Sequence, residues 1–261
     1  MYGLSFLIIF TLILDAGSIQ KTWYTPKAKT SWQWQLNGTI NTKYDVEIYD
    51  VDLFDTPKKT IHDLQKNGKK VICYLSAGSY ENWREDADTF PDRLKGKKMD
   101  GWDELWLDIR DIKLQSIMKK RIKLAQYKGC DGIEVDNIDT YTNKSGFPLT
   151  AKEQLQYNRF LAREAHKRGL SIGLKNDLEQ IKELVNDYDF AINEECHEYQ
   201  ECEKLLPFIE KDKAVLNAEY AQKYRNDLEA TKVMCANSQR MGLSTLILSY
   251  DLDGSYRHSC D

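Results

Sequence analysis

Three carboxylates stand close together at the end of a short apolar segment, residues 132–139. The segment reads GIEVDNID, and its acids are Glu134, Asp136 and Asp139. Burying an unpaired carboxylate is costly, so charge at the tip of a strand marks a mouth, a ligand or a reaction. Two carboxylates that face one another across a cleft can supply a general acid and a nucleophile or base, as glycoside hydrolysis requires.

Other apolar runs in the chain end in the same way. Side chains alternate along a strand, so Glu134 and Asp136 should share the face that points to the interior, with Asp136 nearer the mouth. The residues that end the other runs are Asp50, Asp52, Lys175, Asn176, Asp177, Glu194, Glu195 and Glu219. An acid-rich rim built from several strand ends is therefore the main indication of function.

The second reacting carboxylate stays open between Glu194 and Glu195. Phe190, Ile192 and Glu194 share one face by alternation, which would place Glu195 beside the inward residues. Strand tips often bend or bulge, so alternation does not decide between them. The separation from the first carboxylate would decide the chemistry, since about 5 Å suits a nucleophile and about 6.5–9.5 Å suits a base that acts through water.

Strands and helices alternate from residue 45 to the end of the chain. Helical stretches include residues 155–168, which Gly169 closes, a usual signal for a helix end. The alternation predicts a single-domain (β/α)8 TIM barrel over residues 30–261, with 32–36 as a short accessory strand in a hairpin or cap. The barrel strands are predicted at 46–53, 71–76, 105–109, 132–137, 171–176, 190–194, 214–219 and 245–250.

A doubly wound open sheet is the competing fold. That fold would carry a glycine-rich phosphate turn after its first strand, where residues 50–55 of this chain read DVDLFD. The length of 261 residues also suits one barrel-sized domain better than two average ones. The net charge is -4, and nucleic-acid binding normally needs a basic face, so we expect a cationic or neutral partner and no nucleic acid.

The N-terminus predicts secretion. Residues 4–14 are almost purely apolar, residues 16–18 are small, and the run is shorter than the roughly 20 residues of a bilayer span. We predict a signal peptide at 1–17, a secreted protein and no membrane attachment after its removal. A buried first helix or strand is the alternative, since no Lys or Arg precedes the run. N-glycosylation motifs begin at Asn37 and Asn143.

Secretion would favour disulfides among the six cysteines. Cys196 and Cys202 are close enough in sequence to close one loop, and Cys235 and Cys260 could tie the C-terminal tail to the last helix. Cys73 lies inside an apolar strand and is predicted to be a buried free thiol. The Cys and His spacings do not match a zinc site.

Two further residue groups bear on the chemistry. Aromatic rings can pack on the C–H faces of sugars, and we assign about half of those near strand ends to the core. Carboxylates alone would suit Mg²⁺ or Ca²⁺, but no metal-loop spacing is present, so we expect neither metal nor cofactor. The aromatic residues are Trp34, Tyr49, Tyr74, Tyr80, Trp83, Tyr220 and Tyr250, and the carboxylates of this alternative metal site are Asp50, Asp52, Asp136 and Asp139.

Five short motifs follow one another along the chain. They are DVEIYDVDLFD at 45–55, VICYLSAGSYE at 71–81, CDGIEVDN at 130–137, GLKND at 173–177 and NEEC at 193–196. In this order they resemble the family 114 glycoside hydrolases, the endo-α-1,4-polygalactosaminidases. The resemblance covers roughly residues 30–254 and implies a TIM barrel, secretion, and endo-hydrolysis of an α-1,4-linked galactosamine polymer.

The resemblance also implies a pair of reacting acids. Asp136 matches the family's strand-four Asp in a Glu-x-Asp-Asn motif, and Glu194 matches its strand-six Glu in an Asn-Glu-Gln-Cys motif. Glu195 stands here where Gln is common. The added acid leaves open which of the two glutamates reacts, and like-charge repulsion can raise the pKa of a neighbouring carboxyl.

We therefore predict a monomeric glycoside hydrolase with Asp136 as general acid/base and Glu194 as nucleophile or base. Ammonium groups of deacetylated galactosamine units would be attracted by an acidic rim. A non-catalytic carbohydrate-binding barrel and a metal-assisted hydrolase of another polymer are the alternatives. The residues predicted to shape the substrate cleft are Asp50, Tyr74, Glu134, Asn137, Lys175, Asn193, Glu195, Glu219, Tyr220 and Tyr250.

Overall fold

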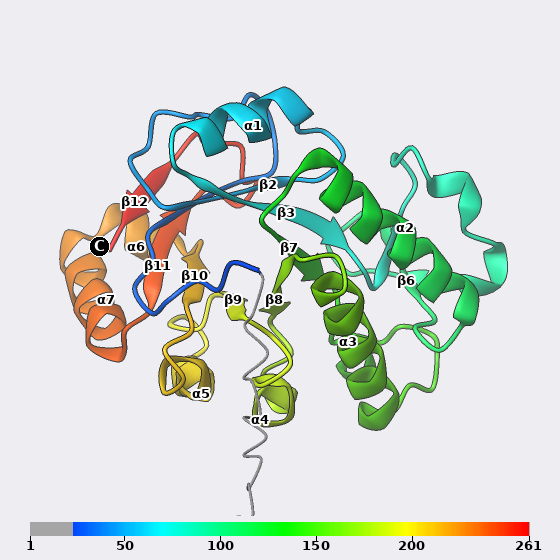
Figure 1. Cartoon of the computed structure of the whole chain (residues 1–261). Coiled ribbons are helices and arrows are strands. Elements are labelled where there is room, and N and C mark those ends of the chain that lie inside the picture. The colour runs from blue at the N-terminus through cyan, green and yellow to red at the C-terminus, as the bar shows by residue number, and fades with distance from the viewer. Residues whose placement is uncertain (1–22, 261) are drawn as a thin grey trace, which may run out of the picture.

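A curled sheet of nine strands forms the centre of the protein (Figure 1). The structure is a computed structural model that describes residues 23–260, so the predicted signal peptide lies outside the described residues. The first eight strands of the sheet are parallel and the last is antiparallel. In spatial order they are β1 (Trp32–Gln35), β2 (Ile48–Asp52), β3 (Lys70–Ser76), β7 (Gly132–Asp136), β8 (Ser171–Lys175), β9 (Phe190–Glu194), β10 (Val215–Glu219), β11 (Ser244–Leu248) and β12 (Arg257–Ser259).

Helices cover the outer face of this sheet (Figure 1). Local signals set their ends: Thr150 and Glu153 form a capping box at the start of α3, and Gly129 ends α2 with a φ of 89°. The α-helices are α1 (Lys58–Lys66), α2 (Ile112–Lys128), α3 (Ala151–His166), α4 (Ile181–Leu184), α5 (Leu206–Ile209), α6 (Gln222–Asn226) and α7 (Leu228–Met241). Short 3₁₀ turns are η1 (Ala87–Thr89), η2 (Asp92–Leu94), η3 (Thr140–Thr142), η4 (Leu178–Gln180) and η5 (Cys202–Leu205).

Apolar side chains fill both faces of the sheet. The larger cluster lies between the strands and the helices, and the smaller one fills the inside of the curl. The inner cluster includes Trp32, Trp34, Ile72, Phe190 and Ile192, all nearly inaccessible to solvent. This apolar interior is the floor on which the polar strand ends rest.

The two ends of the strand order approach each other. The Trp32 indole donates to the carbonyl of Ser244 on β11 (3.0 Å), and Arg257 on β12 donates to the carbonyl of Trp32 (2.9 Å). The chain therefore has an α/β fold with a curled, mostly parallel sheet of TIM-barrel type, as the sequence predicted in outline. Among residues 23–260, no helix has the length and apolar character needed to cross a membrane.

Two strands were assigned to the wrong sheet: one expected outside the main sheet belongs to it, and one expected inside it does not. Residues Trp32–Gln35 were expected in an accessory hairpin or cap, yet β1 is a parallel strand of the main sheet and pairs with β2. The predicted strand at 105–109 corresponds to β6 (Glu104–Leu107), which pairs antiparallel with β4 (Ser79–Glu81) and β5 (Lys95–Lys98) in a separate sheet. Since one error adds a strand and the other removes one, Asp136 and Glu194 still end the fourth and sixth parallel strands.

Three disulfides join the six cysteines. Cys196–Cys202 and Cys235–Cys260 are the two predicted pairs, and both are confirmed. The prediction that Cys73 is a free thiol was wrong, because Cys73 is bonded to Cys130. The cause is that β6 lies outside the main sheet, so β7 pairs directly with β3. Cys130, just before β7, therefore lies next to Cys73.

Candidate active site

Three neighbouring strands each end in a side chain that can take part in chemistry. Asp136 is the last residue of β7, Lys175 of β8 and Glu194 of β9. The residue after each of them has a positive φ, 60° at Asn137, 50° at Asn176 and 59° at Glu195. This left-handed conformation costs free energy for any residue with a Cβ atom, least for Asn. The backbone therefore turns sharply as soon as each of the three side chains has been placed at the mouth.

The Lys175 ammonium connects the acids of these strands. Its Nζ lies 3.1 Å from Oδ1 of Asp136, 3.2 Å from Oε2 of Glu194 and 3.2 Å from Oε1 of Glu134. It also lies 4.9 Å from the centre of the Trp34 ring. Burial acts to lower the pKa of Lys175, which is only 3% exposed, but the three carboxylates outweigh it and raise that pKa well above its usual value. Lys175 is therefore a fixed positive charge at the centre of the site.

Both mouth carboxylates are held on each of their oxygens. Asp136 Oδ2 accepts from the Tyr74 hydroxyl (3.0 Å), and its Oδ1 accepts from the backbone N–H of Asn137 (2.8 Å) as well as from Lys175. Glu194 Oε1 accepts from the Tyr220 hydroxyl (2.7 Å), and its Oε2 accepts from Asn176 Nδ2 (3.3 Å). Both side chains line a cleft, so they are oriented by the protein and open to a ligand.

Two further carboxyls, those of Glu134 and Asp50, lie beneath Lys175. Glu134 Oε2 accepts from the Trp34 indole (3.1 Å), and burial raises the pKa of Glu134 to about 7 although Lys175 acts against it. Burial and the neighbouring Glu134 raise the pKa of Asp50 well above its usual range, although Lys175 acts against them. Neither residue lines the cleft, and both can influence a ligand only through Lys175 and the groups above them.

The cleft above the strand ends has two lobes, of about 600 and 420 Å³. Glu194 lies where the lobes meet, since the residues that line both lobes are Trp102, Asp139, Asn176, Glu194 and Tyr250. Trp102 and Tyr250, which are 46% and 55% exposed, stack with ring centres 5.5 Å apart, and Tyr220 contacts Tyr250 edge-on at 5.4 Å. The acidic residues of the first lobe are Asp52, Asp55, Glu81, Asp100, Asp103, Glu104, Asp136, Asp139, Glu194 and Asp251.

Two residues predicted to bind substrate contact neighbouring protein groups, and of these two Asn193 also lines the second lobe. Asn193 is buried, and its Nδ2 donates to Asn176 Oδ1 (3.1 Å), which orients the amide that contacts Glu194. Glu219 is also buried and accepts from the backbone N–H of His197 (2.8 Å), which fixes the loop after β9. Burial raises the pKa of Glu219 to about 7. Glu219 lines neither lobe, so the structure keeps it apart from the Lys175 cluster.

Phe190 and Ile192 belong to the inner cluster, so the face they share with Glu194 is the inner one. Glu194 therefore points to the inside of the sheet with Phe190 and Ile192. The expectation from alternation that Glu195 would be the inward residue was wrong. Glu194 contacts Lys175, and Glu195 lines the second lobe.

We expect Glu195→Gln to keep kcat within about threefold of wild type and Glu194→Gln to lower it by roughly 10²-fold or more, as steady-state rates on the galactosamine polymer that the resemblance implies would measure. The opposite order would assign the reaction to Glu195.

The cations of the site bear on the alternative of a carboxylate-held metal. Arg84 donates to both oxygens of Asp52, at 3.0 and 2.7 Å, and Lys175 takes one oxygen of Asp136. Within residues 23–260, the group of potential ligands that converges is Cys196, His197 and Cys202, whose two sulfurs form a disulfide. Two of the four carboxylates of that alternative, Asp52 and Asp136, are thus paired with side-chain cations.

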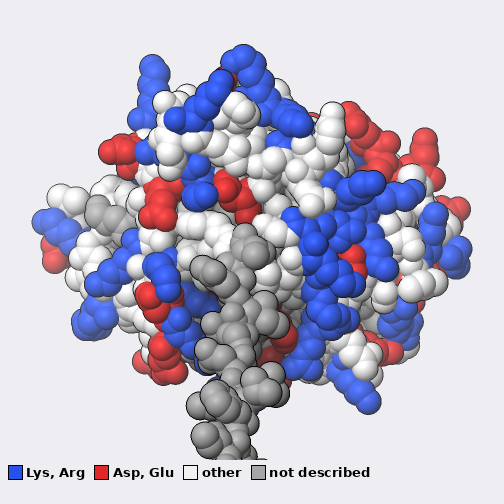
Figure 2. All heavy atoms as spheres, viewed as in Figure 1, with Lys and Arg blue, Asp and Glu red and all other residues white. Residues whose placement is uncertain are grey.

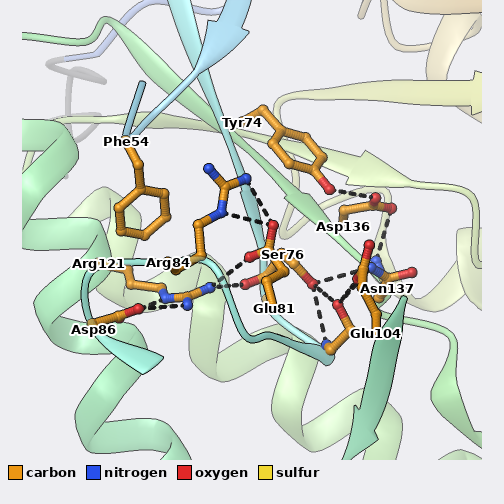
Figure 3. A network of polar contacts seen from close by, with 12 residues as sticks. Phe54, Tyr74, Ser76, Glu81, Arg84, Asp86, Glu104, Arg121, Asp136 and Asn137 are labelled. Atoms are coloured by element: carbon orange, nitrogen blue, oxygen red, sulfur yellow. Dashed lines mark hydrogen bonds and ion pairs between the residues drawn. The ribbon is translucent and has the colours of Figure 1, made fainter. Parts of the chain in front are cut away.

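The separate three-stranded sheet contributes functional residues that the sequence analysis did not find. It brings Trp102 and Glu104 to the cleft, next to an ion-pair network in which Arg84 and Arg121 both contact Glu81 (Figure 3). Trp102 precedes β6 and Glu104 is its first residue, so a search for polar residues at the carboxyl ends of strands could not select them. The acidic pair beside an exposed tryptophan, Asp103 and Glu104, was the available signal.

A TIM-barrel-like sheet whose strand ends hold two oriented carboxylates in an open cleft is an arrangement that glycoside hydrolases use. The chain belongs to the glycoside-hydrolase family GH114, whose model matches residues 15–261. No curated protein sequence matches it. A structure of Ega3 from Aspergillus fumigatus in complex with galactosamine is similar over 91% of this chain and 97% of that one, with 39% sequence identity and a TM-score of 0.85.

More distant structures share the fold alone. The glycoside hydrolase domain of PelA from Pseudomonas aeruginosa is 14% identical, with a TM-score of 0.67 over 86% of this chain and 96% of that one. A trehalulose synthase mutant is 11% identical, with a TM-score of 0.55 over 74% of this chain and 57% of that one.

Proposed function

We propose that this protein is a secreted, endo-acting hydrolase of α-1,4-linked galactosamine-containing polysaccharide. The family supplies the reaction class, and the similar Ega3 structure holds galactosamine. The observation that carries the proposal is the contact of Lys175 with both Asp136 and Glu194 at the base of an acidic cleft. One carboxyl group of such a pair can protonate the glycosidic oxygen while the other acts at the anomeric carbon or on a water molecule.

The shared contact with Lys175 also favours one mechanism. The contacting oxygens of Asp136 and Glu194 each lie within 3.2 Å of the same nitrogen, so their separation cannot exceed the sum of the two distances. The carboxyl groups of retaining glycosidases lie about 5–5.5 Å apart, so a lysine that contacts both acids favours that short separation. We infer that Glu194 attacks the anomeric carbon and that Asp136 protonates the leaving oxygen, then removes a proton from the water that releases the sugar, with retention of configuration.

The charge distribution favours a cationic substrate. Lysine and arginine side chains gather over α2 and α3 (Figure 2), and the exposed ones on α2 are Lys119, Lys120 and Lys123. The first lobe of the cleft, in contrast, is lined by ten acids with Arg84 and Lys175 as its basic residues. Ammonium groups of a deacetylated polymer would be drawn to that lobe and away from the helices.

The two lobes support action inside a polymer. They share Glu194 and otherwise have largely different lining residues, so sugar units can be bound on both sides of the bond to be cleaved. Both carboxylates come from one chain, so a monomer with a complete (β/α)8 barrel would hold the whole active site. Asn37 and Asn143 line the first lobe, so a glycan on either of the predicted sites would stand at the rim of the cleft.

Trp102 should provide a surface for a sugar ring. Truncation to Ala is expected to raise KM for the polymer by up to roughly 10-fold with a smaller change in kcat, because stacking contributes about 0.5–1.5 kcal/mol and acts in the ground state as well as the transition state. Michaelis curves on polymer of fixed length would measure this. Tyr127→Ala, at an exposed ring on α2, is the control. An unchanged KM in Trp102→Ala would remove this residue from the binding surface.

The function is tested with partially deacetylated α-1,4-galactosaminan and mass analysis of the products. The expected result is a range of oligosaccharides from internal cleavage, unaffected by EDTA. Polymer binding without new reducing ends would instead support a carbohydrate-binding barrel. Cleavage that EDTA abolishes would support a metal-assisted hydrolase. Detection of the mature N-terminus in culture medium tests secretion and the signal peptide at 1–17.

A further inference from the structure

The tight turn between β3 and β4, residues 76–79, packs against the backbone that follows Asp136. The N–H groups of Ala77 and Gly78 donate to the carbonyl oxygen of Asp136, at 2.9 and 3.2 Å. A Cβ atom added to Gly78 would lie 1.6 Å from the carbonyl oxygen of Asn137. Only glycine permits so close an approach of two backbones. The turn therefore holds the backbone of the residue pair 136–137 in one place.

Side chains of the same turn hold the Asn137 amide (Figure 3). Asn137 Nδ2 donates to the hydroxyl oxygens of Ser76 (3.0 Å) and Ser79 (3.1 Å), which lie 2.5 Å from each other. The Ser79 hydroxyl donates to Oε2 of Glu104 on β6. A serine hydroxyl has one hydrogen to donate, so the Ser76 hydroxyl must be the donor to Ser79. Glu104 thus sets the direction of every hydrogen bond in this chain.

The other end of the chain of hydrogen bonds is the Asp136 carboxylate. The backbone N–H of Asn137 donates to Asp136 Oδ1 while Asn137 has a φ of 60°. A left-handed residue with a Cβ atom is strained, and such conformations persist where surrounding contacts over-determine them. The two serine hydroxyls supply these contacts to the Asn137 side chain. Without these hydrogen bonds, Asn137 could leave the left-handed conformation in which its backbone N–H donates to Asp136.

The turn itself is fixed from behind by three other elements. The Tyr157 hydroxyl of α3 donates to the carbonyl of Ala77 (2.6 Å), and Arg121 of α2 donates to the carbonyl of Ser76 (2.9 Å). The backbone N–H of Leu107 on β6 donates to the carbonyl of Gly78 (2.9 Å). Because its backbone is fixed by these contacts, the turn can hold the Ser76 and Ser79 hydroxyls in the positions that orient the Asn137 side chain.

We propose that Glu104 and Ser79 are positioning residues, which fix the Asn137 side chain and thereby hold its backbone N–H on Asp136 Oδ1. This inference rests on the proposed function in one respect, since it takes Asp136 as the reacting group. Catalysis depends on reacting groups held to within about 1 Å, and misplacement by that distance can cost roughly 10²-fold in rate. The separate sheet of β4, β6 and β5 thereby has a part in catalysis as well as in lining the cleft.

The required feature of Glu104 is an acceptor oxygen, whichever its ionisation state. Burial raises the pKa of Glu104 to about 7; Ser79 and Arg84 act against this, and Glu81 and Asp136 reinforce it. A protonated carboxyl and a glutamine amide both keep a carbonyl oxygen that can accept from Ser79. Glu104→Gln should therefore preserve the hydrogen bond that Glu104→Ala removes.

The test compares Glu104→Ala, Glu104→Gln and Ser79→Ala with wild type. The measurements are kcat and KM on α-1,4-galactosaminan and the NMR hydrogen-exchange rate of the backbone N–H of Asn137. We expect Glu104→Ala and Ser79→Ala to lose at least about 10-fold in kcat with KM within about twofold, and to exchange the Asn137 amide at least about 10-fold faster. Glu104→Gln should stay within about threefold of wild type in both. Glu164→Ala is the control, since Glu164 is also 7% exposed and lies on α3 outside the cleft.

Wild-type kcat and wild-type Asn137 exchange in Glu104→Ala, or in Ser79→Ala where the first variant fails to fold, would overturn the proposal. A loss in Glu104→Gln equal to that in Glu104→Ala would also overturn it, because charge rather than the hydrogen bond would then matter. Asp136→Asn in the same assay separates the two proposals: an active Asp136→Asn refutes the proposed function, whereas the exchange rates still decide whether Glu104 holds Asn137.

Discussion

Asp136→Asn is expected to lower kcat on the polymer by roughly 10³-fold while the protein stays folded. General acid catalysis contributes about 10²–10⁴-fold, and an amide cannot protonate the leaving oxygen. The substitution is nearly isosteric: the amide oxygen can still accept from Asn137 and Lys175, and the amide nitrogen can donate to the Tyr74 oxygen. Initial rates of reducing-end formation and the melting temperature, measured together, check both parts of the expectation.

A substrate with an activated leaving group separates the role of Asp136 from that of Glu194. A dinitrophenyl glycoside of a galactosamine oligomer needs no protonation to depart, so Asp136→Asn should recover much of its first-step rate on it, and Glu194→Gln should not. Asp108→Asn, at an aspartate paired with Arg110 outside the cleft, is the matched control. Equal recovery in both active-site variants, or full activity of Asp136→Asn on the polymer, would contradict the assignment.

The position of Asp136 could be predicted from sequence because two simple rules coincide there. An apolar strand that runs into acid places charge at a mouth, and alternation separates Glu134 and Asp136 from Ile133 and Val135. The same rule misled at β9, since strands of a parallel sheet are buried on both faces and apolar residues then mark neither face as the outer one. Phe190 and Ile192 face the inside of the curl, and Glu194 follows them.

Relations between strands were less accessible than the strands themselves. The patterns at β1 and β6 both indicate a strand, but nothing local records which partner each strand pairs with. The consequence reached the cysteines, because the neighbour of β3 decides whether Cys73 can meet Cys130. The hydrogen bonds from Glu104 to Asn137 were inaccessible for the same reason, since they join β6, the β3–β4 turn and β7.

Lys175 is the clearest example, since its position at a strand end was evident and its role was not. Sequence placed it among residues that shape the cleft, whereas the structure puts its ammonium within 3.2 Å of three carboxylates. Removing one partner of a buried ion pair typically costs about 3–5 kcal/mol, because the remaining charge has no compensation. Lys175→Met keeps the length of the side chain and removes only its charge and hydrogen bonds.

We expect Lys175→Met to be destabilised by a few kcal/mol at pH 8 and by clearly less at pH 5, by urea unfolding at both values. The sign follows from Glu134, whose pKa of about 7 already exceeds the unfolded value of about 4.3 and rises further without Lys175. A carboxyl with a raised folded pKa favours the folded state fully below its unfolded pKa and loses that contribution as pH rises through the folded one.

The control for Lys175→Met is Lys128→Met, which removes an ammonium bound by the backbone carbonyls of Leu53, Phe54 and Thr56. Those carbonyls do not titrate, so its loss of stability should be nearly the same at pH 5 and pH 8. Lys175→Met should also lower kcat by at least about 10-fold at either pH, since Asp136 and Glu194 would lose the contact that sets their separation. A loss of stability that is equal at the two pH values would show that Lys175 does not neutralise the buried carboxylates.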